Sequence, residues 1–259
     1  MLSERWGVRA RYDRQMDSGA SPHGSRIAFF GGSFDPPHLG HLAVGRAART
    51  ALALDVVLFA PVGAQPLKPQ GSTASFEDRL AMTRLAIADE PGFELSLADE
   101  PRPSGDPNYT IDTLGKLRAG LAPEGVLFCL MGADSFFGLR GWHRSAEIPF
   151  IAPLIVASRP GQKPEDWISG LREALPPGLQ IDPEIPADVP SHNLEMQAYR
   201  VHSPSGESAP FYLLPGLYVD ISASQIRDQV RAGFSPLAGG RTLLPRAVFD
   251  YIRSHGLYR

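Results

Sequence analysis

The most constraining feature of this sequence is a short apolar run followed at once by a glycine-rich turn and a predicted helix. Residues 27–30 are apolar, and residues 31–42 read Gly-Gly-Ser-Phe-Asp-Pro-Pro-His-Leu-Gly-His-Leu. We expect a strand at 27–30 and a helix from about His38 to Leu52, because apolar side chains recur there at helical spacing. Another apolar run of strand length, Val56–Ala60, follows. This strand–helix–strand unit predicts an α/β fold whose parallel sheet is covered on both faces.

The same alternation continues along the chain. Apolar runs predict further strands at 93–97, 126–131, 154–157, 211–214 and 217–219. Capping residues, or a proline near the first turn, predict where the later helices start: Ser75, Thr110, Ser222 and Pro245. Gly256 is expected just past the end of the last helix.

Two stretches depart from this pattern. Residues 1–25 show no periodicity and are expected to form an extension without stable structure. Residues 160–210 contain nine prolines, and we expect only one short helix there, within an insertion or long connection. The chain from 26 to 259 is otherwise predicted to be a single domain.

Composition excludes several classes of protein. The formal charge of −3 over 259 residues gives no overall attraction to nucleic acid or to an anionic membrane. No apolar run approaches the roughly 18 residues that a membrane span needs, and the first residues lack the apolar core of a secretory signal. Cys129 is the only cysteine and lies in an apolar run, so we expect a reduced core residue. The cytoplasm is the expected compartment.

The turn and the helix start predict a site for a polyphosphate. Gly31, Gly32, Ser33 and Phe34 present backbone where a phosphate or nucleotide can approach closely. His38 and His41 are three residues apart, so both imidazoles project from one face of the first helical turn. The alternative is a tight turn followed by two surface histidines.

With this motif the chain resembles the nucleotidylyltransferase superfamily, which carries a His-x-Gly-His motif after its first strand. The resemblance implies a Rossmann-like, doubly wound sheet, here with a small C-terminal helical part. It also implies the joining of a nucleoside triphosphate to a phosphate-bearing acceptor, with loss of pyrophosphate.

The superfamily's second mark, Ile-Ser-x-Thr/Ser-x-x-Arg, is matched by residues 221–227. Ser222 and Ser224 lie at a predicted helix N-terminus, where amides and hydroxyls can hold phosphate oxygens. Arg227 can add a bidentate charged contact. The alternative is an ordinary serine-capped helix with a solvated arginine.

Other segments are similar to bacterial nicotinate-nucleotide adenylyltransferases: Tyr109–Leu114, Gly132–Ser135 with Trp142, Arg159–Gly161 and Pro245–Tyr258. The resemblance implies that Gly132 and Asp134 lie at the ATP site, although Asp134 also fits a plain helix cap. It implies an acceptor site with Tyr109, with Trp142 stacking on a nicotinate ring, and with the Thr110 amide near its carboxylate. His143 stands where the family usually has a second aromatic residue. Core anchoring of Trp142 and simple capping by Thr110 are the alternatives.

Four basic residues are interpreted separately. Lys68 matches a family lysine that reaches ligand phosphates, and solvent exposure is its alternative. Arg159 either contacts the acceptor or only fixes its own turn. Arg79 and Arg84 share a predicted helix and are expected to lie in solvent.

The resemblance implies that ATP and nicotinate mononucleotide form deamido-NAD and pyrophosphate. The catalytic residues would be His38, His41, Lys68 and Arg227, and Mg²⁺ would arrive with ATP without a dedicated carboxylate cage. The alternatives are another acceptor, such as pantetheine phosphate or nicotinamide mononucleotide, a cytidylyltransferase, or a nucleotide-binding protein without activity. An NAD-dependent oxidoreductase is disfavoured because Gly-x-Gly-x-x-Gly does not follow the first strand. The sequence leaves monomer and homo-oligomer open.

Overall fold

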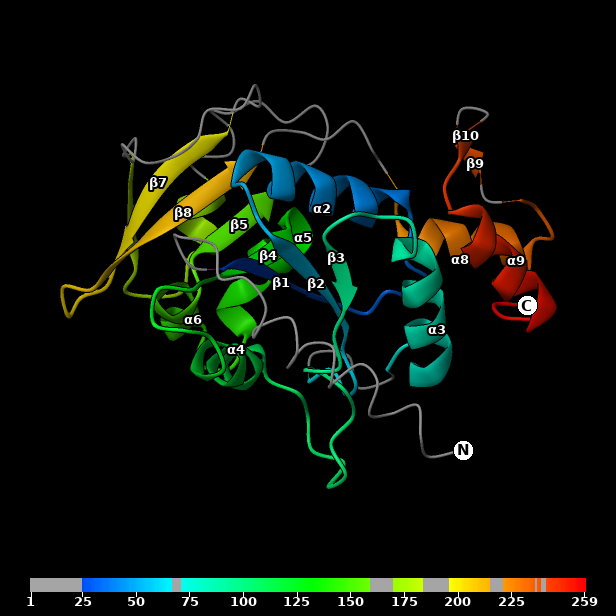
Figure 1. Cartoon of the computed structure of the whole chain (residues 1–259), viewed down its shortest axis with the longest axis horizontal. Helices are drawn as coiled ribbons and strands as arrows, with labels where there is room; N and C mark the ends of the chain where they lie inside the picture. Colours follow the sequence, from blue (N-terminus) through cyan, green and yellow to red (C-terminus); the bar gives the residue numbers. More distant parts are fainter. Residues whose placement is uncertain are drawn as a thin grey trace.

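The computed structural model describes residues 25–66, 71–158, 170–183, 196–214, 221–235, 237–238 and 241–259 (Figure 1). Its strands are β1 (Arg26–Gly32), β2 (Val56–Pro61), β3 (Phe93–Leu95), β4 (Val126–Gly132), β5 (Leu154–Ala157), β6 (Gln180–Pro183), β7 (Gln197–His202), β8 (Ser208–Leu214), β9 (Leu237–Ala238) and β10 (Arg241–Thr242). Its helices are α2 (Leu39–Ala51), α3 (Phe76–Ile87), α4 (Thr110–Ala119), α5 (Ala133–Phe137), α6 (Ile148–Ile151), α8 (Ala223–Arg231) and α9 (Arg246–Ser254). Two 3-10 helices, η1 (Leu139–Gly141) and η2 (Ser145–Glu147), precede α6.

The main sheet has the strand order β3-β2-β1-β4-β5-β8-β7-β6. In this order, β3, β2, β1, β4, β5 and β8 run parallel to one another. Strand β7 then pairs antiparallel with β8, and β6 pairs antiparallel with β7. Successive strands are added in opposite directions from the central β1–β4 pair: β2 and β3 lie beyond β1, and β5 and β8 lie beyond β4. This is the topological switch point at which α/β sheets bind ligands, beyond the carboxyl ends of the strands. The predicted α/β, doubly wound class is confirmed.

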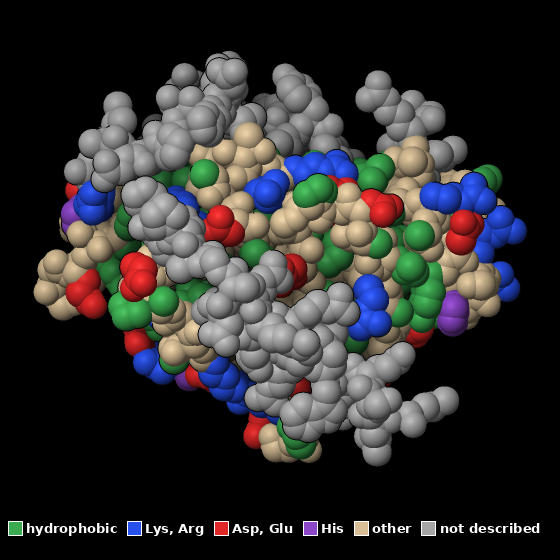
Figure 2. All heavy atoms as spheres, in the orientation of Figure 1, with side chains coloured by type: hydrophobic (Ala, Val, Ile, Leu, Met, Phe, Trp, Pro, Cys, Tyr) green, Lys and Arg blue, Asp and Glu red, His purple; other side chains and the backbone are tan. Residues whose placement is uncertain are grey.

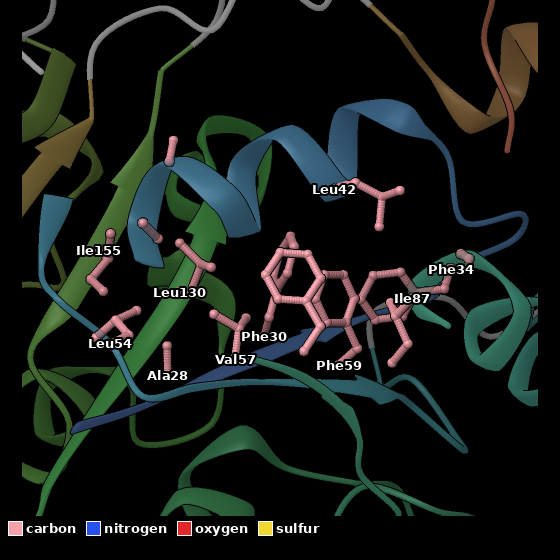
Figure 3. Close-up of a cluster of buried hydrophobic side chains, with 14 of the residues drawn as sticks. Ala28, Phe30, Phe34, Leu42, Leu54, Val57, Phe59, Ile87, Leu130 and Ile155 are labelled. Atoms are coloured by element: carbon pink, nitrogen blue, oxygen red, sulfur yellow. The ribbon is translucent and has the colours of Figure 1, made fainter. Parts of the chain in front are cut away.

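Side chains of each central strand alternate between two cores, as the two-residue period of a strand requires. On one face, Ala28 and Phe30 pack with α2, α3, α8 and α9 (Figure 3). On the other face, Ile27 and Phe29 pack with α4, α5 and α6. Figure 1 shows α2 over the first face, with α4 and α6 across the sheet from it. Both faces are therefore covered, as the continuous apolar strands predict.

The single cysteine behaves as expected. Cys129 lies on β4 in the second core with 2% of its surface exposed, and it is a free thiol. Burial raises its pKa to about 12, so it stays protonated and unreactive at neutral pH.

The central predictions are confirmed with small shifts of boundary. The helix predicted from Thr110 has Tyr109 as its N-cap, so Thr110 is the first helical residue and not the cap. The expectation of one short helix between 160 and 210 is incomplete, because β6, β7 and the start of β8 also lie there. These strands form a meander at the sheet edge. They were not predicted because their sequences lack a continuous apolar run. Residues 1–24 and 217–219 lie outside the described residues.

The C-terminal part packs against the end of the molecule that holds α3 (Figure 1). Val248 and Ile252 of α9 are buried in the core that includes α2. Pro245 is the N-cap of α9, and Gly256 has a positive φ of 62° just after the helix. This is the predicted proline–glycine asymmetry. Among the described residues, none of the helices is both long and apolar enough to cross a bilayer.

Candidate active site

The turn after β1 brings backbone to the switch point. The pairing of β1 with β4 stops at Phe30 and Leu130, and beyond it Gly31 and Gly32 pair only with β2. A Cβ on Gly31 would lie 2.8 Å from carbon atoms of the Phe29 ring, so glycine is needed there. Past this point β4 pairs with β5 alone. The two central strands therefore part, and their backbones line the space between them.

Phe34 has a role different from that of the glycines. Its φ is 47°, which is an uncommon backbone conformation for a side chain of this size. Its ring is 1% exposed and packs edge-on against Phe30 and His41, as Figure 3 illustrates for Phe30. Only the backbone of Phe34 is thus available to a ligand, while its ring fixes the turn.

The two histidines of the motif lie face to face. His38 is the N-cap of α2, and its ring stacks on that of His41 with centroids 3.7 Å apart. The backbone N–H of His38 donates to Nδ1 of His41 over 3.1 Å. An imidazole nitrogen that accepts carries no proton, so the proton of neutral His41 is on Nε2. His41 therefore presents Nε2–H as a hydrogen-bond donor.

Burial favours the neutral form of both imidazoles. It lowers the pKa of His38 to about 4 and lowers that of His41 well below its usual value, with His38 adding to the shift of His41. Nδ1 of His38 is buried and has no hydrogen-bond partner among the described residues. A buried nitrogen without a partner costs free energy, and a bound polar ligand can supply that partner.

Two buried charged residues, Asp35 and Arg79, which the sequence did not reveal, support the turn. Asp35 is 4% exposed, and its carboxylate accepts from the N–H groups of Thr73 (2.6 Å) and Ala74 (3.1 Å). Arg79 is 2% exposed and donates to the carbonyls of Ser33 (2.7 Å) and Val62 (2.8 Å). Arg79 thereby joins the loops that follow β1 and β2.

The expectation that Arg79 lies in solvent is therefore wrong, whereas Arg84 is exposed as expected. Helical spacing placed both residues on α3 but did not distinguish their environments. Burial lowers the pKa of Arg79, and the charge of Asp35 partly offsets this effect.

The helix start at 221–227 reaches the same turn. Ser222 caps α8 by accepting from the N–H of Gln225 over 3.1 Å, as predicted. Arg227 donates to the Asp35 carbonyl (2.7 Å) and to the hydroxyl of Ser224 (3.1 Å). The two motifs, distant in sequence, thus meet in space, and Arg227 is not a freely solvated side chain.

Gly132 and Asp134 lie on the other side of the switch point. Gly132 ends β4, and a Cβ there would meet no atom of the described residues within 4 Å. Asp134 is exposed in the first turn of α5. Within the described part of the chain, Gly132 thus has room beside it, at the sheet edge where the resemblance implies a nucleotide.

Of the residues predicted to bind the acceptor, the structure describes Tyr109, Thr110, Trp142 and His143. The ring centroids of Tyr109 and His143 lie 4.4 Å apart. Trp142 is partly buried against the core on the α4 side of the sheet. Thr110 begins α4, whose first amides have no partner within the helix.

The loop after β2 connects the turn after β1 with the start of α4. Nε2 of Gln65 donates to the Ser33 hydroxyl over 2.6 Å. Asn108 exchanges two hydrogen bonds with Ala64, one through its side chain (3.0 Å) and one through its backbone (2.9 Å). Asn108, which directly precedes Tyr109, was missed in the sequence, although an asparagine between breaker residues and a helix start is a recognisable signal.

Two predicted site residues, Lys68 and Arg159, lie outside the described residues. No cluster of three or more His, Cys, Asp or Glu side chains able to hold a metal occurs within the part of the chain that is described. The Asp35 carboxylate already accepts from the N–H groups of Thr73 and Ala74 and from the hydroxyl of Tyr258. On the face shown in Figure 2, acidic and basic side chains are interspersed.

Comparison with known proteins agrees with this geometry. The family described as cytidylyltransferase-like matches residues 29–229. A protein of Gloeobacter violaceus named "Probable nicotinate-nucleotide adenylyltransferase" is 37% identical and covers 91% of this chain and 97% of its own length. A protein of the same name from Citrifermentans bemidjiense is 39% identical and covers 90% and 98%.

The fold has a solved counterpart. The structure of the Plasmodium falciparum nicotinic acid mononucleotide adenylyltransferase complexed with NaAD aligns with a TM-score of 0.63 at 15% identity, covering 90% of this chain and 97% of the other. At that identity the likeness concerns the fold alone. The family model and the sequence relatives show that the chain belongs to the cytidylyltransferase-like family and, within it, to the nicotinate-nucleotide adenylyltransferases.

Proposed function

We propose that this protein transfers the adenylyl group of ATP to nicotinate mononucleotide, forming deamido-NAD and pyrophosphate. The observation that carries this proposal is the meeting of His38, His41 and Arg227 on one turn at the sheet's switch point. The family relatives, each named as an adenylyltransferase for this acceptor, support the choice of substrates.

The chemistry requires positioning more than proton transfer. A phosphate oxygen of the acceptor attacks the α-phosphorus of ATP, the bond from that phosphorus to the bridging oxygen breaks, and pyrophosphate leaves with the electron pair. The attacking oxygen is already an anion, so the reaction needs no general base. The work left to the protein is to align the two substrates and to stabilise the charge that develops on phosphate oxygens.

Each residue of the triphosphate side has a role in that task. His41, fixed by the N–H of His38, donates from Nε2 to an α-phosphate oxygen. His38 gains a partner for its unsatisfied nitrogen. The amides of residues 31–34 and of the start of α2 add donors, and Ser222, Ser224, Arg227 and Lys68 hold the remaining phosphate oxygens.

The described residues suit Mg²⁺ that is carried by ATP. They hold no carboxylate cluster, and the Asp35 oxygens are already bonded to protein donors. The triphosphate and water would supply the ligands, as Mg²⁺ commonly retains several waters. When bound, the ion neutralises phosphate charge, which adds to the effect of the histidines.

The acceptor side would select the nicotinate. Trp142, with Tyr109 and His143, offers aromatic surface for the ring, and the first amides of α4 at Thr110 suit a carboxylate. Arg159 would complete the contacts to the acceptor. Gly132 and Asp134 would complete the contacts to ATP.

The direct test measures pyrophosphate release from ATP and Mg²⁺ by the full chain, with the acid and the amide mononucleotide as matched acceptors and pantetheine phosphate as a third. We expect deamido-NAD as the product, with kcat/KM at least about tenfold higher for the acid, since one charged contact contributes on the order of 1.5 kcal/mol or more. Equal kcat/KM for acid and amide would show that the carboxylate is not read. ATP binding without release of pyrophosphate from any acceptor would indicate a non-catalytic nucleotide-binding protein.

A further inference from the structure

Residues 241–259, together with α8, hold the histidine turn from outside. The N–H of Leu39, the first residue of α2, donates to the carbonyl of Leu243 over 3.0 Å. Arg227 binds the Asp35 carbonyl, and the hydroxyl of Tyr258 donates to Oδ1 of Asp35 over 2.7 Å. Three hydrogen bonds thus fix the chain between Asp35 and Leu39, which includes His38.

The Tyr258 bond closes a buried network. Tyr258 is 6% exposed. Besides the hydroxyl of Tyr258, the N–H groups of Thr73 and Ala74 in the adjoining loop donate to the Asp35 carboxylate. Burial and the Asp35 charge raise the pKa of Tyr258, so its hydroxyl stays a donor throughout the working range of pH. A buried carboxylate that loses one donor must rotate or be hydrated, and either change disturbs its remaining bonds.

The backbone at Tyr258 is also specialised. Its φ is 64°, a left-handed backbone conformation that residues other than glycine seldom adopt. Such a conformation persists only where surrounding contacts determine it. Here the contacts are the core around the ring and the hydrogen bond to Asp35.

We propose that Tyr258 is a positioning residue for adenylyl transfer, acting through Asp35 on the turn that carries His38 and His41. The proposal rests on the function proposed above. The orientation of Asp35 determines the direction of its carbonyl, which accepts from Arg227. It also determines the path of the chain that follows, in which the N–H of His38 fixes the imidazole of His41.

The segment offers a matched control. Tyr251 lies on α9, and its hydroxyl donates to Oδ1 of Asp78 over 3.0 Å. Tyr251→Phe and Tyr258→Phe each remove one hydroxyl bonded to a carboxylate. The first bond ends on α3 and the second on the histidine turn, so a purely structural role predicts equal consequences for catalysis.

The experiment compares wild type, Y258F and Y251F by steady-state kinetics, below the thermal midpoint of each variant. For Y258F we expect kcat to fall about tenfold and KM for ATP to rise severalfold, with KM for the acceptor within twofold of wild type. For Y251F all three constants should stay within twofold. Equal losses in both variants, or no loss in Y258F, would overturn the proposal.

A second measurement uses only the wild-type chain, so it holds even if Y258F does not fold. If the Tyr258 contact favours the ATP-binding form, bound ATP must in turn stabilise the segment, because coupling is reciprocal. Hydrogen exchange of residues 246–259 should slow severalfold with a non-hydrolysable ATP analogue, while that of 110–119 changes little. Unchanged exchange in 246–259 would contradict the inference. An inactive wild type that shows the protection would contradict the proposed function, while the coupling between the Tyr258 segment and the ATP site would stand.

Discussion

The two halves of the proposed site, one for the triphosphate and one for the acceptor, are built differently. In the triphosphate half, buried side chains are tied by hydrogen bonds to three other segments: Asp35 to Thr73 and Tyr258, and Arg79 to Val62. In the acceptor half, Tyr109, Thr110 and Trp142 are only partly buried and His143 is exposed. The rings of Tyr109 and His143 meet by contact alone.

This difference matches what each half must recognise. A triphosphate presents charge in a fixed pattern, and donors aimed at developing charge act best when they are held in place beforehand. A planar ring is bound by stacking, which tolerates some adjustment. We therefore expect substitutions in the first half to lower kcat and substitutions in the second half to raise the KM of the acceptor.

The largest expected effect is that of His41→Ala. Removal of one preorganised donor at developing charge lowers kcat by about 10²- to 10³-fold, while KM for the acceptor changes little. His255, an exposed histidine beyond α9, provides the control, and His255→Ala should retain wild-type kinetics. A His41→Ala variant with near-wild-type kcat would contradict the assignment of the triphosphate half.

The next effect concerns stability and pH. Because burial lowers the pKa of His38 to about 4, the folded protein binds its proton less readily than the unfolded chain. The stabilising contribution is complete above about pH 6.5, the pKa of an unfolded histidine. It is lost as the pH falls from there through about 4, for a total of about 3 kcal/mol.

Urea denaturation of wild type and His38→Asn between pH 7 and 4 measures this effect. Asparagine keeps a helix-capping side chain but does not titrate, so the variant should lose less free energy of unfolding over that range. If the free energy of unfolding fell equally with pH in the two proteins, burial would not lower the pKa of His38, and this residue would not belong to the buried part of the triphosphate half.

The smallest effect is expected in the acceptor half. Trp142→Ala should raise KM for nicotinate mononucleotide about fivefold, in line with roughly 1 kcal/mol for an aromatic pair beyond its buried area. Its kcat and its KM for ATP should change little. Phe234→Ala is a control, since Phe234 is 69% exposed on the chain after α8. A Trp142→Ala variant altered mainly in kcat would remove the proposed distinction between the halves.

Much of the fold could be predicted from the sequence because the central strands are continuous apolar runs. The strands at β1, β2, β4 and β5 were predicted to within two residues at either end. Strands β6 and β7 at the end of the sheet were not, because they lack such a run and depend on the pairing of β7 with β8 and of β6 with β7. Tertiary context, rather than local preference, determines their structure.

The structure of the candidate site was predictable where its residues are close in sequence. The motif from Gly31 to His41 indicated a phosphate site by its local order, and Ser222 was correctly predicted as a cap. The support for that site was not predictable, because Arg227 and Tyr258 reach Asp35 across 192 and 223 positions of sequence. Likewise, the apolar period of α3 did not show that Arg79 lies inside.

The bond between Asp35 and Tyr258 has a consequence for synthesis on the ribosome. Translation proceeds at roughly 5–20 residues per second, so about 10 to 45 s separate the appearance of these two residues. Throughout that interval the nascent chain has its histidine turn but lacks the hydroxyl that completes the Asp35 network. The capacity to handle ATP productively would therefore be acquired late and abruptly, when the segment after α8 leaves the exit tunnel and docks.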